Sequence, residues 1–156
     1  MQAESGRTAG APGRPEALTV WTELCEVVDR GRLAVSRALQ RQAGLTLAEN
    51  LVLCQVAMAP DAQLQMVALA RTLGIAKSAI TKTVDRLEER GWLRRERDTE
   101  DRRAVRATLT PAGAAAFALA QPAYLAAVGA FLTGPLSEPE LGRLHRLMRE
   151  ILDTAP

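Results

Sequence analysis

The spacing of apolar residues predicts a mainly helical chain. From about Ala17 to Gln42 they recur at helical intervals, which predicts a long first helix that ends at Gly44. Thr46 and Glu49 have the spacing of a capping box, in which the hydroxyl and the carboxylate each accept a backbone N–H. The helix that they open, to about Met58, is apolar almost all round, so we expect it in the middle of the core.

A pair of short helices is predicted next, after a break at Pro60 and Asp61. The first covers about Gln65–Leu73 and the second about Lys77–Arg90, with Gly74 in the turn between them. Two short helices joined by three or four residues that include a glycine have the spacing of a helix-turn-helix.

The periodicity changes from helical to alternating after Gly91, at the end of the second short helix. Residues 92–97 and 102–109 predict two strands around a turn at 98–101. A β-hairpin directly after a helix-turn-helix is a wing.

The rest of the chain returns to helical spacing. Thr110 is the expected N-cap and Pro111 the first residue of a helix to about Leu132, with a kink at Pro122. Ser137 and Glu140 have capping-box spacing and open a last helix, whose apolar residues form one stripe.

Composition supports a single, mainly α domain. The chain has 156 residues, of which 47% are hydrophobic and only 3% aromatic, so the core is built from Leu, Ala and Val. Residues 1–15 hold three glycines and two prolines and predict a disordered arm, followed by one domain over 16–156. The start of the chain has no apolar leader, and no stretch reaches about 18 uninterrupted apolar residues. We therefore expect a cytoplasmic protein that does not engage a membrane.

Positive charge is concentrated in one window. The net charge is only +2, but residues 77–106 hold ten of the twenty Lys and Arg residues against seven Asp and Glu. A local basic stripe on a nearly neutral protein is the pattern that binding to nucleic-acid phosphates requires.

The second short helix has two distinct faces. Ile80, Val84 and Leu87 fall at i, i+4 and i+7 and predict its core side. A second face carries polar residues: Ser78, Thr81, Lys82 and Asp85. Hydroxyl groups and a cation near the start of such a helix suit base edges and phosphates in a major groove, although an ordinary solvated face has the same composition.

The wing is rich in arginine. Thirteen residues contain six of them: Arg94, Arg95, Arg97, Arg102, Arg103 and Arg106. Guanidinium groups suit phosphates and narrow minor grooves. Asp98 and Asp101 would repel phosphate, so we interpret them as braces that hold the turn while an arginine projects from its tip. The alternative is a salt-bridged hairpin that binds nothing.

Four ordered segments resemble the MarR family of winged helix-turn-helix transcriptional regulators. They are Leu69-Ala-Arg-Thr-Leu-Gly-Ile75, the helix from Ser78 to Gly91, Arg95-Glu-Arg-Asp-Thr-Glu-Asp-Arg-Arg103 and Leu109-Thr-Pro-Ala-Gly113. The similarity covers about Leu69 to Gly113, and the wing motif is its most specific part. The sequence departs from the family at Ala76, where a capping Ser, Thr or Asp is common, at an expected cost of about 1 kcal/mol to the helix start.

The resemblance implies an α+β winged helix-turn-helix fold that forms a triangular homodimer. The winged helix-turn-helix would cover about 46–110, and the dimerisation helices about 17–43 and 111–154. Recognition helices would enter successive major grooves and wing arginines the flanking minor grooves. By position, Arg103 matches the wing-tip arginine, Asp101 its partner, and Ser78, Thr81 and Lys82 the residues that contact bases and phosphates. The residues predicted to bind DNA are thus Lys77, Ser78, Thr81, Lys82, Arg95, Arg102 and Arg103, with Asp98 and Asp101 as wing braces.

The predicted function is a DNA-binding transcriptional regulator, a ligand-responsive repressor that acts as a homodimer on a palindromic operator. The family suggests a small aromatic acid as effector, bound where the dimerisation helices meet the winged domain, and the effector-binding residues stay unassigned. Two alternatives stay open: a nonspecific architectural DNA-binding protein, and a thiol-based redox sensor that uses Cys25 or Cys54.

Other chemistry has little support in the sequence. Cys25 and Cys54 lie 29 residues apart, and the chain has a single His, so we expect neither a metal site nor a cofactor. The neighbours of both cysteines are apolar or acidic, which disfavours a reactive thiolate. The cysteine-sensing branch of the family has its reactive Cys some three residues before Cys25. The chain shows no nucleophile–base pair and no phosphate-binding loop, so we expect no enzyme.

Overall fold

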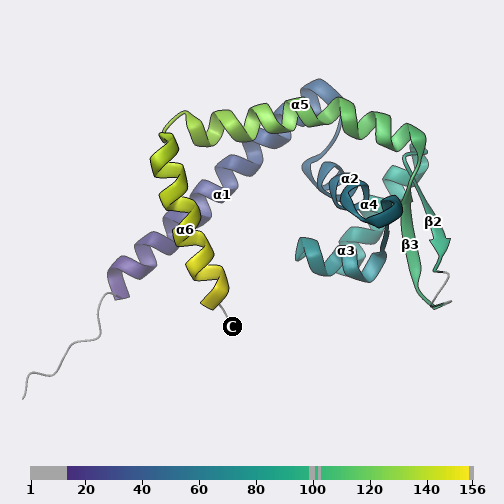
Figure 1. Ribbon diagram of the computed structural model, residues 1–156, viewed down its shortest axis with the longest axis horizontal. Helices are drawn as coiled ribbons and strands as arrows, with labels where there is room; N and C mark the ends of the chain where they lie inside the picture. Colours follow the sequence, from purple (N-terminus) through teal and green to yellow (C-terminus); the bar gives the residue numbers. More distant parts are fainter. Residues whose placement is uncertain (1–13, 99–100, 102, 155–156) are drawn as a thin grey trace, which may run out of the picture.

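The computed structural model describes residues 14–98, 101 and 103–154 (Figure 1). The predicted arm, except for its last two residues, and Thr99, Glu100 and Arg102 of the wing lie outside the described residues. The elements follow the predicted order: α1 Arg14–Ala43, α2 Leu47–Met58, a short 3-10 helix Pro60–Ala62, β1 Gln63–Gln65, α3 Met66–Leu73, α4 Lys77–Glu89, β2 Leu93–Arg97, β3 Val105–Leu109, α5 Pro111–Thr133 and α6 Glu138–Thr154.

The predicted helix starts have the expected hydrogen bonds. Thr46 Oγ1 accepts the N–H of Glu49 at 3.2 Å, and the Glu49 carboxylate accepts the N–H of Thr46 at 2.9 Å, which confirms the capping box of α2. Thr110 caps α5 by accepting the N–H of Gly113 at 3.0 Å. Ala76 precedes α4 without a side-chain cap. Local sequence signals therefore place the helix boundaries to within a few residues.

The sheet has one strand more than predicted. Its order is β1-β3-β2, with both pairs antiparallel, and Gln65 of β1 lies opposite Arg106 of β3. On the other side of β3, Leu93 pairs with Leu109 and Arg97 with Val105. The strand β1 has only three residues, too few for an alternating pattern to be visible in the sequence.

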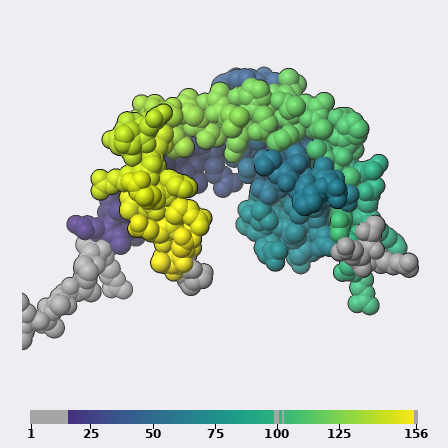
Figure 2. Space-filling model, in the orientation of Figure 1, coloured from purple at the N-terminus to yellow at the C-terminus, as the bar shows by residue number. Residues whose placement is uncertain are grey.

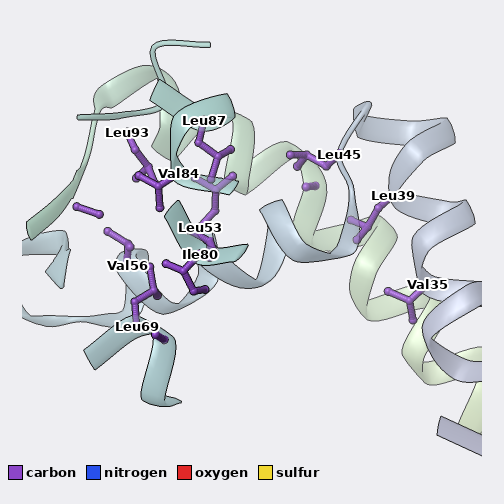
Figure 3. Packing of buried hydrophobic residues seen from close by; sticks show 14 residues of the cluster. Val35, Leu39, Leu45, Leu53, Val56, Leu69, Ile80, Val84, Leu87 and Leu93 are labelled. Carbon is purple, nitrogen blue, oxygen red and sulfur yellow. The ribbon is translucent and has the colours of Figure 1, made fainter. Parts of the chain in front are cut away.

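The core of the winged unit, which we define as residues 45–110, lies between α2, α3, α4 and the sheet. Figure 3 shows Leu53 of α2, Leu69 of α3 and Leu93 of β2 converging with the three predicted core residues of α4, namely Ile80, Val84 and Leu87. All of these side chains are fully buried. The face of α4 that carries Ser78, Thr81 and Lys82 is consequently left at the surface.

The remaining helices form a frame beside the winged unit. Figure 1 shows α5 running across the molecule, with α1 along it and α6 descending at the end far from the sheet. Among the described helices, α5 is long and apolar enough to cross a membrane by length and composition, and only 11% of its apolar window is buried within the chain. The polar Gln121 interrupts the apolar run, which is why a count of uninterrupted apolar residues did not select it.

The junction between the wing and α5 requires glycine at position 113. A Cβ there would lie 2.0 Å from the carbonyl oxygen of Trp92, a backbone atom that cannot move aside. We expect Gly113→Ala to lower the free energy of unfolding by at least about 1–3 kcal/mol, because the added methyl overpacks the junction. Urea denaturation of the variant and the wild type measures this difference in free energy.

Gly129→Ala is the matched control on the same helix, since a Cβ at Gly129 meets nothing within 4 Å. There alanine should stabilise the protein by about 0.5–1 kcal/mol through its helix propensity. Equal stability of the Gly113→Ala variant and the wild type would contradict the close approach seen at Trp92.

Candidate nucleic-acid interface

The exposed face of α4 begins at its first turn. Lys77, Ser78, Thr81 and Lys82 are all exposed, and the Thr81 hydroxyl donates to the carbonyl of Lys77 at 2.9 Å. Asp85, on the same face one turn later, is ion-paired with Arg95 at 2.6 Å. The first half of α4 thus offers two cations and two hydroxyl groups, while the acidic residue beyond them is already neutralised.

Asp98 holds the base of the wing together. It is only 2% exposed, and its Oδ2 atom accepts hydrogen bonds from Gln65 of β1 and Arg106 of β3. Its Oδ1 atom accepts the N–H of Asp101 at 3.2 Å. One buried carboxylate therefore ties the end of β2 to both other strands and to the turn.

Asp101 organises the backbone of the turn. Its carboxylate accepts the N–H of Arg103 at 2.9 Å, and its carbonyl accepts the N–H of Ala104 at 2.8 Å. The Arg103 side chain is exposed at this point. The brace expected at Asp101 acts here on the arginine's backbone, and the predicted contact residue Arg102 lies outside the described residues.

The arginines of the winged unit divide into paired and unpaired groups. Arg95 binds Asp85 and Glu88, Arg94 binds Glu96, Arg86 binds Glu49, and Arg106 binds Asp98. Within the described residues of the unit, five cations form no ion pair: Arg71, Lys77, Lys82, Arg97 and Arg103.

Comparisons with known proteins agree with this geometry. Residues 45–105 match the model of the MarR family. A MarR family transcriptional regulator from Streptomyces coelicolor, solved in complex with DNA, is 29% identical, with 91% of this chain and 89% of that chain covered and a TM-score of 0.82. Residues 45–105 of the chain therefore resemble the MarR family, and the chain shares its fold with a MarR family regulator.

Two further solved structures share the fold. A mutant MarR from E. coli, complexed with operator DNA, is 25% identical, with 88% of this chain and 96% of that chain covered and a TM-score of 0.78. BpsR from Bordetella bronchiseptica is 24% identical, with 85% and 98% covered and a TM-score of 0.76. No curated protein sequence matches the chain. The winged-helix fold of the protein is thus the fold of MarR-type transcriptional regulators.

Two exposed arginines of the candidate interface lie outside the predicted site. Arg71 and Arg97 are exposed and unpaired among the described residues, although neither was selected as a contact. What marks these two arginines as candidate contacts is that no acidic side chain pairs with them, and this can be seen only in the folded structure. The described residues also contain no group of three His, Cys, Asp or Glu side chains placed to hold a metal ion.

Glu49 of α2 binds two arginines at the C-terminal end of α4. Besides capping α2, its carboxylate pairs with Nε of Arg86 at 3.0 Å and lies 3.9 Å from Nη1 of Arg90. Burial raises the pKa of Glu49, but the hydrogen bonds from Thr46 and Arg86 and the charge of Arg90 together lower it below the usual 4.5. The ionised carboxylate therefore joins the start of α2 to the second half of the recognition helix.

This depressed pKa sets the sign of a pH dependence. A carboxyl whose pKa is lower folded than unfolded stabilises the fold above its unfolded pKa, and that stabilisation is lost as the pH falls through the folded pKa. We expect Glu49→Gln to lower the free energy of unfolding by about 1–3 kcal/mol at neutral pH, because the Thr46 N–H and the Arg86 guanidinium lose the charge of their buried acceptor.

The difference between the wild type and Glu49→Gln should shrink as the pH falls below 4.5, the ordinary value for this group. Urea denaturation at a series of pH values measures it. Glu89→Gln, an exposed change on α4, is the control and should differ little from the wild type at any pH. A pH-independent cost for Glu49→Gln would contradict the assigned ionisation.

Proposed function

We propose that the protein is a sequence-specific repressor whose homodimer binds a palindromic operator, with α4 in the major groove and the wing in the adjacent minor groove. The observation that carries the proposal is the exposed first half of α4, with unpaired Lys77 and Lys82 beside the two hydroxyl groups. Hydroxyl groups and cations at this end of a recognition helix read base edges and bind phosphates. Two relatives of 29% and 25% identity were solved with DNA, the second with operator DNA.

The wing prediction concerns Arg103. Arg103→Ala should weaken operator binding by about 1–3 kcal/mol, because an exposed guanidinium is removed from the minor groove. The melting temperature should hardly change, since Arg103 has no ion pair among the described residues. Fluorescence anisotropy with a fragment selected from genomic DNA, at matched salt, gives the affinity.

Asp101→Ala gives the sharper test. Removal of a negative charge should strengthen DNA binding by electrostatics alone, whereas loss of the hydrogen bond to the Arg103 N–H should weaken it. Tighter binding by Asp101→Ala would contradict the brace. Equal wild-type affinity for random and selected DNA would favour the architectural alternative.

The homodimer is proposed from the surface of the frame. Among the described residues sixteen large hydrophobic side chains are exposed, and most of them lie on α1, α5 and α6: Leu18, Val20, Trp21, Leu24, Val27, Val28, Leu33, Leu119, Leu125, Leu147, Met148, Ile151 and Leu152. A patch of this extent marks an interface. We propose a second copy of the chain as the partner that covers this patch. A membrane would cover it too, but the proposed cytoplasmic DNA-binding function leaves the frame outside a membrane. Half-sites about 34 Å apart would then match the two copies of α4.

The effector site is proposed in a cavity of about 420 Å³ between the frame and the winged unit. Figure 2 shows the molecule hollowed below α5, between α6 and the winged unit. The cavity itself is lined by α1, α2, α5 and the α3–α4 turn, with Arg32 and Tyr124 as polar groups among apolar walls that include Leu51, Ile75, Val128 and Phe131. This lining suits a small aromatic acid, with the ring on the apolar walls and the carboxylate near Arg32.

Occupancy of this cavity would couple to DNA binding through its walls. The residues Gly74 and Ile75 belong to the turn before the recognition helix, and Val128 belongs to α5. A molecule held between them changes how far α4 stands from the frame, and thus from its counterpart in the dimer. The fold relative BpsR is a precedent, since 6-hydroxynicotinic acid regulates its DNA binding.

Val128→Phe tests the effector site by filling the cavity. A panel of aromatic carboxylic acids should contain compounds that raise the melting temperature of the wild type and release it from DNA. Both effects should be lost in Val128→Phe and kept in Met58→Phe, whose site is exposed and outside the lining. Release of Val128→Phe at wild-type concentrations would place the effector elsewhere.

The thiol alternative makes the opposite prediction. Cys25 is exposed on α1, not buried in the core of its own chain, and Cys54 is partly buried in α2. Release by peroxide, abolished by Cys25→Ser or Cys54→Ser and reversed by a reductant, would replace the ligand proposal with a redox switch.

A further inference from the structure

Arg95 connects the wing to the recognition helix. It lies in the middle of β2, and its side chain reaches back to α4, where Nη1 binds Glu88 Oε2 at 2.7 Å and Nη2 binds Asp85 Oδ1 at 2.6 Å. Nη2 also donates to the carbonyl of Thr81 at 3.1 Å, and the backbone N–H of Arg95 donates to Glu88 Oε1 at 2.8 Å. A single residue of the wing thus binds groups on three successive turns of α4. We call these four contacts the clasp.

The clasp leaves Arg95 poorly suited to bind DNA directly. Its side chain is only 25% exposed, whereas Arg103 and Lys82 are exposed and unpaired in the described part of the chain. To reach a phosphate, Arg95 would have to leave two carboxylates, which would then face the phosphates without a counter-ion. The other anchor of the wing, Asp98, joins strands to one another and not to α4.

We propose that Arg95 is a positioning residue, which fixes the wing relative to α4 so that both enter their grooves together and which does not itself contact DNA. The proposal rests on the proposed DNA-binding function and replaces the sequence-based assignment of Arg95 as a contact. Phosphate and base contacts then belong to the unpaired residues on either side of the clasp.

The decisive variant removes negative charge and not the arginine. Asp85→Asn with Glu88→Gln makes the protein more positive, so a purely electrostatic effect would tighten DNA binding. The clasp predicts the reverse: weaker binding by severalfold, because the wing loses its fixed position. Glu89→Gln on the same helix is the control, since Glu89 is exposed and has no ion pair among the described residues; it should bind as the wild type or slightly better.

Arg95→Lys separates positioning from phosphate contact. Lysine keeps the charge but cannot bind two carboxylates and a carbonyl at once. We expect weaker binding to the selected genomic fragment, with loss of hydroxyl-radical protection in the flanking minor grooves alone. Protection of the DNA at the central major grooves should persist. A variant protein that had unfolded would lose this protection as well. Circular dichroism at the assay temperature checks that each variant is folded.

Two outcomes would overturn the proposal. An affinity of the double variant equal to or above that of Glu89→Gln would show that the clasp does not position the wing. A salt slope lowered by about 0.9 in Arg95→Gln, the share of one lost phosphate contact, together with full protection of the flanking minor grooves, would show that Arg95 touches DNA. Tight wild-type binding with either result refutes the clasp alone, whereas a wild type that binds no genomic fragment refutes the proposed function together with it.

Discussion

An apolar frame that one chain cannot cover is the constraint on which the whole arrangement depends. The large hydrophobic side chains exposed on α1, α5 and α6 form the surface that the proposed second copy would cover. The same helix α5 follows directly from the winged unit, where the Thr110 hydroxyl donates to the carbonyl of Trp92 and Gly113 packs closely against that carbonyl. In the proposed homodimer, the contact between the two frames would therefore also set the distance between the two copies of α4.

The winged unit is held rigid by ion pairs that span its elements. Glu49 joins α2 to α4, Asp98 joins the three strands, and Arg95 joins β2 to α4. Buried or half-buried charges of this kind are favourable only when their partners are all in place, so they specify one arrangement and penalise others. A rigid unit means that a molecule in the cavity under α5 would act by moving the whole unit against the frame.

The sequence predicted what local chemistry decides, and missed what depends on distant partners. Caps at Thr46 and Thr110 and the glycine turns located the helices, and the spacing of Ile80, Val84 and Leu87 oriented α4 correctly. The strand β1 was missed because three residues show no period. The hydrogen bond between Asp98 and Gln65 could not be predicted either, because Gln65 lies 33 residues away in the sequence. Arg95 was assigned as a DNA contact because the sequence does not show how the wing folds back on α4, where Asp85 and Glu88 bind its side chain.

Light scattering tests the central claim, that two copies share the frame and present two recognition helices. The account predicts about twice the 16.8 kDa chain mass at micromolar concentration, and the same two copies on one selected DNA fragment. Ile151→Asp, on the exposed apolar stripe of α6, should shift the free protein toward 16.8 kDa and weaken its DNA binding while its helical circular dichroism persists. A wild type that stays at 16.8 kDa and binds the fragment as one copy would contradict the account.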